Sequence, residues 1–304
     1  VLKMAGVDMV LSAYDSMYPV EGVRYVFFDE IQYTENWELW MKAIYDSRKD
    51  IRLAATGSAS PIIEDASTDS GTGRWTVIKI PTLSFYEYCQ LLQLDDMPLL
   101  PDHLKITDIP KMENAEVADL MARFEPLVKH FNRYLTIGGF PELALSDDDL
   151  YAQRMLREDV VDKVIKRDVL TLFKVRSPLL MEKLFLYLCM NSTEIFSATT
   201  AAKELDNISP NTIESYVDAL VKSNLIYMAY PIAVGSKSVL KGRPKIYIAD
   251  AAIRNAVLMV DDVLSDEREL GLLIETTVYK HLVSFYQGTG AQLGYYRKAK
   301  ENQK

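Results

Sequence analysis

Residues Tyr25-Val-Phe-Phe-Asp29-Glu30-Ile-Gln32 form an apolar run that ends in two adjacent carboxylates. The run is short and rich in aromatic and β-branched residues, which predicts a strand buried on both faces of a parallel sheet. Acids at the end of such a strand lie where open α/β sheets bind ligands, at the carboxyl ends of the strands. The alternative is an ordinary strand that ends in a solvated turn, because short apolar strings followed by acids are common.

The segment after the acids predicts a helix and then a second strand. Residues 36–45 carry apolar side chains at helical spacing, and Ile51-Arg-Leu-Ala-Ala-Thr56-Gly57-Ser58 reads as a buried strand ending in a small polar turn. The order strand, helix, strand is typical of an α/β core. Thr-Gly-Ser is also an ordinary strand-to-loop turn, since each of these residues is common in turns.

The acidic pair resembles the Walker B element of nucleotide-hydrolysing ATPases. This resemblance implies that Asp29 holds the Mg²⁺ of bound ATP and that Glu30 orients or deprotonates the attacking water. In AAA-type ATPases the following strand ends in a polar residue that senses the γ-phosphate. The resemblance assigns that sensor role to Thr56 or Ser58.

A third stretch is similar to a signature of a prokaryotic family of AAA-type ATPases. It is Gly73-Arg74-Trp-Thr-Val-Ile-Lys-Ile80-Pro-Thr-Leu83-Ser84-Phe85-Tyr-Glu87. Thr82 departs mildly from that signature, which usually has Leu or Pro before Leu-Ser-Phe. The resemblance makes Arg74 a candidate arginine finger, although an Arg before a strand can simply pair with a loop carboxylate.

Further elements in the family's order extend the resemblance along nearly the whole chain. The family's "GGhPE" element resembles Gly138-Gly139-Phe140-Pro141-Glu142, and its "(K/R)-D-(I/V)" helix resembles Lys166-Arg167-Asp168-Val. The second motif lies within residues 149–173, whose amphipathic pattern predicts a long helix. Residues 209–220 and Lys245-Ile-Tyr-Ile-Ala-Asp250 resemble its winged-helix core and the strand that follows.

The expected fold is therefore α/β, with a partial P-loop-type parallel sheet followed by a helical lid, a winged helix and the start of a nuclease-like domain. The expected boundaries are 1–83 for the partial ATPase core, 84–177 for the lid region, 178–250 for the winged helix and 251–304 for the nuclease-like part.

The sequence contains no G-x-x-x-x-G-K-[ST] loop, which such ATPases use to cradle the phosphates of the nucleotide. The chain begins at Val1 without a Met, and the first strand that we identify already carries the acidic pair. We therefore expect that segments are missing at the front, and at the back the chain stops where relatives would continue.

The expected winged helix has three helices and two strands. The helices lie over 179–190, 198–205 and 211–223, and the strands over 225–230 and 245–249. Ser209 and Asn211 are candidate caps of the third helix. Such modules bind DNA or pack on protein. The third helix carries Glu214 and Asp218, a poor surface for phosphates, so the wing is the better candidate for DNA contact. The basic side chains of the wing region are Lys237, Lys241, Arg243 and Lys245.

Glu275 is one acid inside an apolar helical stripe, residues 270–282. It resembles the first metal ligand of restriction-nuclease-like folds, but one carboxylate cannot do this chemistry. Glu275 is then a remnant of a site or a paired helix residue, and a nuclease function is disfavoured.

Composition indicates a cytoplasmic globular protein. The chain has 304 residues, is 49% hydrophobic, and has no apolar run of eighteen residues that would span a membrane. The net charge of −9 has the wrong sign for a protein that coats nucleic acid. Cys89 and Cys189 predict buried free thiols, and three scattered histidines give no zinc-ligand spacing.

The sequence thus favours a fragment of an ATP-binding, Mg²⁺-dependent AAA-type hydrolase. In the intact parent, the nucleotide state is expected to be coupled to the winged helix. A homo-oligomer is compatible with this interpretation. The alternative is a non-enzymatic adaptor or DNA-binding scaffold with a degenerate ATPase core. A phosphate-binding loop upstream of Val1 would distinguish the two.

Overall fold

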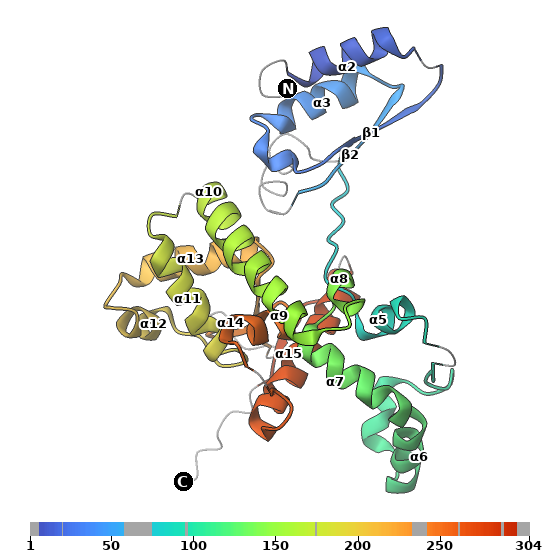
Figure 1. Cartoon of the computed structure of the whole chain (residues 1–304), viewed down its shortest axis with the longest axis vertical. Helices are drawn as coiled ribbons and strands as arrows, with labels where there is room; N and C mark the ends of the chain where they lie inside the picture. Colours follow the sequence, from blue (N-terminus) through green and yellow to red (C-terminus); the bar gives the residue numbers. More distant parts are fainter. Residues whose placement is uncertain are drawn as a thin grey trace.

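The computed structural model describes residues 6–19, 21–57, 75–94, 97–173, 175–232, 242–260, 262–286 and 289–296. Figure 1 shows a small N-terminal α/β unit joined by an extended segment to a larger, mainly helical part. The α/β class expected from the sequence is confirmed at this coarse level.

The N-terminal unit contains the predicted strand, helix, strand. Strands β1 (Arg24–Phe28) and β2 (Ile51–Ala55) pair in parallel, with Arg24 opposite Ile51 and Phe28 opposite Ala55. Between them lie the one-turn helix η1 (Ile31–Tyr33) and α3 (Trp37–Ser47), and α2 (Val7–Met17) precedes them.

Both helices of this unit pack on one face of the two strands. Val7 of α2 and Ile44 of α3 bury against the inward side chains of the sheet, among them Val26 and Phe28. On the opposite face, Tyr25 and Phe27 are 71% and 76% exposed. The expectation that the first strand is buried on both faces is therefore wrong, because no described element covers its second face.

A four-residue ion-pair network closes the amino-terminal edge of this sheet. Arg24 pairs with both Asp15 and Asp50, and Arg48 pairs with the same two carboxylates. Hydrogen bonds from Arg48 and Arg24 lower the pKa of Asp50. The network therefore ties α2 and the end of α3 to the start of both strands.

Extended residues 75–84 lead into the helical part. Ser84 caps the next helix through a capping box, in which its hydroxyl accepts from the Glu87 N–H at 3.3 Å and the Glu87 carboxylate accepts from the Ser84 N–H at 2.8 Å. The helices that follow are α5 (Phe85–Leu91), η2 (Ile106–Lys111), α6 (Asn114–Phe124), η3 (Glu125–Leu127), α7 (Val128–Ile137) and α8 (Pro141–Ala144).

The long helix expected over residues 149–173 is confirmed as a continuous helical run. It comprises α9 (Asp149–Arg157), the π-helical segment η4 (Glu158–Val169) and α10 (Leu170–Leu172). The π-helical middle was not predicted from the sequence.

Three helices and a hairpin follow. They are α11 (Pro178–Met190), α12 (Ala198–Glu204), α13 (Pro210–Lys222), β3 (Ile226–Pro231) and β4 (Lys245–Ile248), all near the predicted positions. Ser209 is the residue before α13 but its side chain makes no capping bond, and Asn211 lies inside the helix, so neither side chain acts as the expected cap.

The sheet of this part has the order β4-β3-β5. Strands β3 and β4 are antiparallel, whereas the short β5 (Gly294–Tyr295) runs parallel to β3. Helices α14 (Ala251–Leu258) and α15 (Glu267–Tyr286) come between β4 and β5.

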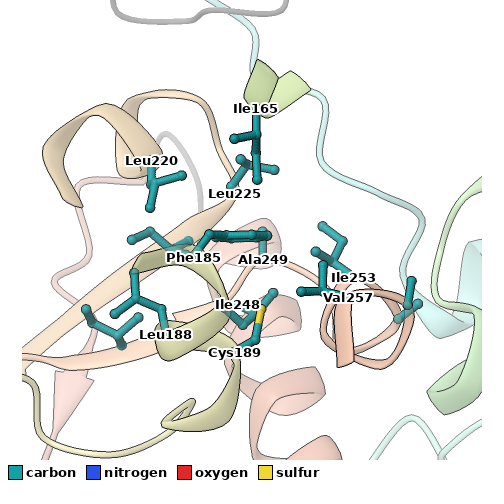
Figure 2. Close-up of a cluster of buried hydrophobic side chains, with 14 of the residues drawn as sticks. Ile165, Phe185, Leu188, Cys189, Leu220, Leu225, Ile248, Ala249, Ile253 and Val257 are labelled. Carbon is teal, nitrogen blue, oxygen red and sulfur yellow. The ribbon is translucent and has the colours of Figure 1, made fainter. Parts of the chain in front are cut away.

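The main hydrophobic core lies within the helical part. Figure 2 shows side chains from α11, α13, β4, α14 and η4 gathered in it, including Phe185, Leu220, Ile248 and Ile165. Cys89 and Cys189 are buried and free, as predicted, and burial raises the pKa of the Cys89 thiol to about 11. No helix within the described ranges combines the length and apolar character needed to cross a bilayer.

Candidate functional site

Asp29, Glu30 and Thr56 meet at the carboxyl ends of β1 and β2. The two strands run in parallel, so the residues that follow them emerge at the same edge. The Thr56 hydroxyl donates a hydrogen bond to Asp29 Oδ1, and it accepts one from the Glu30 N–H at 3.3 Å. One hydroxyl therefore links both acids of the first strand to the end of the second.

Backbone hydrogen bonds hold this cluster beyond the strands themselves. The Thr56 N–H donates to the Phe28 carbonyl at 2.8 Å, and the Ile31 N–H donates to the Thr56 carbonyl at 3.0 Å. Because these bonds continue the parallel ladder, the relative positions of the three side chains follow from strand pairing.

Glu30 has a left-handed backbone conformation, with φ 51° and ψ 48°. This region is sterically unfavourable for residues with a Cβ and is found often at functional sites. The carboxylate of Glu30 accepts a hydrogen bond from Gln32 Nε2 within η1. Gln32 itself is only 8% exposed, so the side chain that contacts Glu30 is fixed by packing.

The cluster is open to solvent and offers oxygen atoms. Asp29, Glu30 and Thr56 are all exposed. Across the described segments, no group of three or more His, Cys, Asp and Glu side chains is arranged to hold a metal ion by itself. Carboxylate and hydroxyl oxygens suit Mg²⁺, which commonly takes one or two protein carboxylates and completes its shell with water and phosphate oxygens. The residues present therefore fit a nucleotide-borne Mg²⁺.

Two other residues predicted for this site lie outside the described residues. These are Ser58, the alternative sensor, and Arg74, the candidate arginine finger. Thr56 is thus the sensor candidate whose contacts can be described.

Glu275 lies on α15, where it pairs with β4. Its carboxylate accepts hydrogen bonds from Lys245 Nζ and from Tyr247 OH, each at 2.8 Å. Burial and the contact with Glu275 raise the pKa of Tyr247. The sequence left two interpretations of Glu275, a remnant of a metal site or a paired helix residue, and these contacts agree with the second.

A buried ion pair that the sequence analysis missed joins α14 to α15. Lys280 Nζ lies 2.6 Å from Asp250 Oδ2, and the two side chains are 2% and 3% exposed. Burial raises the pKa of Asp250, but the charge of Lys280 together with hydrogen bonds from Lys280, Thr82 and the Ala252 N–H outweighs it, so the pKa is lowered overall. The sequence signal for this pair is a lysine within a largely apolar helical stretch.

The ion pair also holds the segment that leads from the N-terminal unit. Asp250 Oδ2 accepts from Thr82 Oγ1 at 2.7 Å, and Lys280 Nζ donates to the Leu83 carbonyl at 2.9 Å and to Tyr134 OH at 2.7 Å. Residues 82–83, α7, α14 and α15 therefore meet at one buried polar centre.

The Gly138-Gly139 pair lets this centre form. Gly138 has φ +74°, and a Cβ there would come within 2.4 Å of Asp250 Oδ1. A Cβ on Gly139 would lie 2.1 Å from the Leu83 carbonyl oxygen, while its N–H donates to Asp250 Oδ2 at 3.1 Å. Three motifs singled out in the sequence, around residues 83, 139 and 250, thus form one structural unit.

His281 fixes the start of α5 beside this centre. Its Nε2 accepts from the Phe85 N–H at 2.8 Å, so the ring proton is on Nδ1, which lies 2.7 Å from the Thr277 carbonyl. Burial lowers the pKa of His281 and keeps the ring neutral.

Comparison with protein families matches two parts of the chain. Residues 4–89 match a family model described as "AAA domain", and residues 128–264 match one described as "Domain of unknown function (DUF8612)". The first match includes Asp29, Glu30 and Thr56, and it supports a relationship of this part of the chain to AAA-type ATPases.

Similar curated proteins are themselves uncharacterized. The chain is 28% identical over 303 residues to MJ1637 of Methanocaldococcus jannaschii, a match covering 97% of this chain and 62% of that protein. It is 24% identical over 269 residues to MJ1544 of the same organism, covering 86% and 54%. A protein of Haemophilus influenzae is 24% identical over 234 residues, covering 76% and 51%.

The chain therefore spans between about half and two thirds of the length of these relatives. No solved structure matches the chain.

Proposed function

We propose that the chain is part of an AAA-type ATPase whose hydrolytic site includes Asp29, Glu30 and Thr56. The observation that carries the proposal is the position of the Thr56 hydroxyl, which contacts Asp29 and the Glu30 N–H at the carboxyl edge of two parallel strands. These residues lie within the part of the chain that matches an AAA domain.

Each residue has a separate role in this proposal. Mg²⁺ bound with ATP would neutralise the negative charge of the phosphates. Asp29 holds that ion through its carboxylate, directly or through water, and Glu30 orients the attacking water and accepts its proton. Thr56, which links the two acids, senses the γ-phosphate. Ser58 and Arg74 remain candidates for the sensor and the arginine finger.

The phosphate-cradling loop would come from a part of the protein that this sequence does not include. The sequence has no such loop, and the curated relatives are longer than the chain. The exposed face of β1, with Tyr25 and Phe27, supports a sheet that further elements complete, because parallel sheets are normally covered on both faces.

The test is Glu30→Gln in the longer natural protein. We expect this variant to bind Mg-ATP as tightly as the wild type but to lose turnover, because an amide keeps the shape of the side chain and cannot accept the proton. Nucleotide binding is measured by isothermal titration and turnover by phosphate release. Glu35→Gln, at an exposed acid a few residues away, is the matched control and should hydrolyse ATP normally. Hydrolysis by Glu30→Gln at the wild-type rate would rule out the proposed role.

A second candidate function is a non-enzymatic adaptor or DNA-binding scaffold. The order of α11, α12, α13, β3 and β4 favours it, because three helices followed by an antiparallel hairpin are compatible with a winged helix over 178–250. In this alternative the core over 1–83, the lid region over 84–177 and the nuclease-like part over 251–304 serve as scaffold. Absence of Mg-ATP binding by the longer protein would favour it.

A further inference from the structure

The one-turn helix η1 touches both Glu30 and the helical part of the molecule. Gln32 of η1 donates to the Glu30 carboxylate, and the Tyr33 hydroxyl donates to Asp168 Oδ1 at 2.5 Å. Asp168 belongs to η4, so a single turn contacts the N-terminal unit on one side and the long helical run on the other. In Figure 1 that run, which ends in α10, extends toward the N-terminal unit.

Two of the contacts that hold Glu30 come from this turn. The Tyr33 N–H donates to the Glu30 carbonyl at 3.3 Å, and Gln32 binds the Glu30 side chain. The third, from the Glu30 N–H to Thr56, comes from the neighbouring strand. Since the backbone of Glu30 is left-handed, surrounding contacts are needed to keep it in this conformation.

Asp168 is well suited to anchor Tyr33. It is a carboxylate with only 8% of its surface exposed, and a buried carboxylate requires hydrogen-bond donors. It also lies in a π-helical segment, a geometry that is uncommon and is found frequently at functional sites. The contact thus combines a buried charge with an unusual helix at the boundary between two parts of the molecule.

We propose that Asp168 is a positioning residue for Glu30 and acts through Tyr33 and η1. The helical part then holds Glu30 ready to activate water, and separation of η4 from the N-terminal unit releases η1 and slows hydrolysis. This inference rests on the hydrolytic role proposed for Glu30, and it adds a physical link between that residue and the helical part.

The first test uses the longer natural protein with Tyr33→Phe, which removes only the hydroxyl. We expect kcat for ATP to fall by about tenfold or more, since the loss of one hydrogen bond to a charged group corresponds to at least that factor, while KM changes less than about twofold. Asp168→Ala should also lower kcat, and the double variant should be no slower than Asp168→Ala alone, because each of these variants lacks the hydrogen bond between Tyr33 and Asp168. If Asp168→Ala does not fold, Tyr33→Phe alone decides.

Tyr14→Phe is the matched control. Tyr14 is 52% exposed on α2 of the same unit, and its loss of a hydroxyl should leave kcat unchanged.

The second test needs no nucleotide. Hydrogen exchange at the backbone amides of residues 31–34 should be faster in Tyr33→Phe than in the wild type, whereas exchange in α2 should be the same in both. Normal ATP turnover in Tyr33→Phe, or unchanged exchange at residues 31–34, would overturn the positioning role and leave the proposed function intact. A wild-type protein that neither binds nor hydrolyses ATP would overturn the proposed function, and the positioning role with it.

Discussion

Glu30 combines an unfavourable backbone conformation with the position expected of a catalytic acid. A non-glycine residue in the left-handed region costs about 1 kcal/mol or more. In the N-terminal unit Asn36 shares this conformation, but Asn tolerates it better because its short side chain can bond locally to the backbone. The catalytic role proposed above would be a reason to keep Glu30 at this position despite that cost.

We predict that Glu30→Gly raises the stability of the N-terminal unit, or leaves it unchanged, while ATP turnover in the longer protein is lost. Glycine adopts the left-handed region freely, so the gain is up to about 1 kcal/mol, reduced by the greater freedom of the unfolded chain. Urea unfolding followed by tryptophan fluorescence measures the change, because Trp37 and Trp40 both lie in this unit. A loss of more than about 1 kcal/mol would mean that Glu30 contributes to the fold rather than opposing it.

At the residue scale, the sequence predicted that Asp29, Glu30 and Thr56 follow strand ends, but not their conformations. Asp29 and Thr56 follow two strands that a helix connects, and parallel pairing then brings them to one edge. The left-handed Glu30 and the contact with Gln32 depend on how η1 packs, which no local pattern encodes. The contact of Tyr33 with Asp168 joins residues 135 positions apart and had no sequence signal.

The helices α7, α14 and α15 are held together by a polar centre rather than by apolar packing alone. Asp250 caps α14 by accepting from the Ala252 N–H at 3.0 Å, and the same carboxylate binds Lys280 of α15. A buried charge that loses its partner is strongly unfavourable, so each half of the pair depends on the other.

We predict that Lys280→Met destabilises the helical part by about 3–5 kcal/mol, because it leaves the Asp250 carboxylate buried without its counterion. The double variant Asp250→Asn with Lys280→Met should recover part of that loss, since no charge then remains buried. Urea unfolding followed by circular dichroism of the helices measures both.

Lys245→Met is the control for this prediction. It removes the ion pair with Glu275, whose side chain is 44% exposed, so the expected loss is below about 1 kcal/mol. A Lys280→Met variant as stable as Lys245→Met would mean that water or another cation reaches Asp250.

At the element scale, the sequence predicted the helices and strands well and their long-range polar contacts poorly. Periodicity placed α11, α13, β3 and β4 to within about two residues, because their buried faces repeat at regular spacing. The π-helical character of η4 was missed, since its residues still show an amphipathic pattern at the ordinary α-helical period. Motifs near residues 83, 139 and 250 were found separately, and a lone lysine in a largely apolar helix does not indicate which residues it contacts.

Across the whole molecule, a short two-stranded sheet carries the candidate site, and a larger helical part carries most of the core. The predicted burial of β1 on both faces failed because an apolar strand does not reveal whether its covering elements are present. Tyr25 and Phe27 lie on that uncovered face, although their residue types alone suggested a buried strand.

The region around β3 and β4 has two possible roles, binding to DNA and packing on protein. Lys237 and Lys241 lie outside the described residues, whereas Arg243 is described, and its carbonyl accepts from Tyr295 OH at 2.8 Å next to β5. On α13, Lys222 pairs with Asp218 at 3.3 Å, so this cation is offset by a neighbouring acid. With a net charge of −9, these features favour packing on protein over binding to DNA.

We predict that replacing Lys237, Lys241 and Arg243 together with Ala leaves any DNA affinity of the longer protein unchanged and alters its domain arrangement or assembly instead. If these side chains contacted phosphates, each lost contact would weaken binding and reduce the dependence of log affinity on log salt concentration by about one. Fluorescence anisotropy with a labelled duplex at two salt concentrations separates the two roles, and sedimentation reports assembly. A clear loss of affinity together with a shallower salt dependence would identify this region as the DNA-binding surface, because packing on protein does not release counterions from DNA.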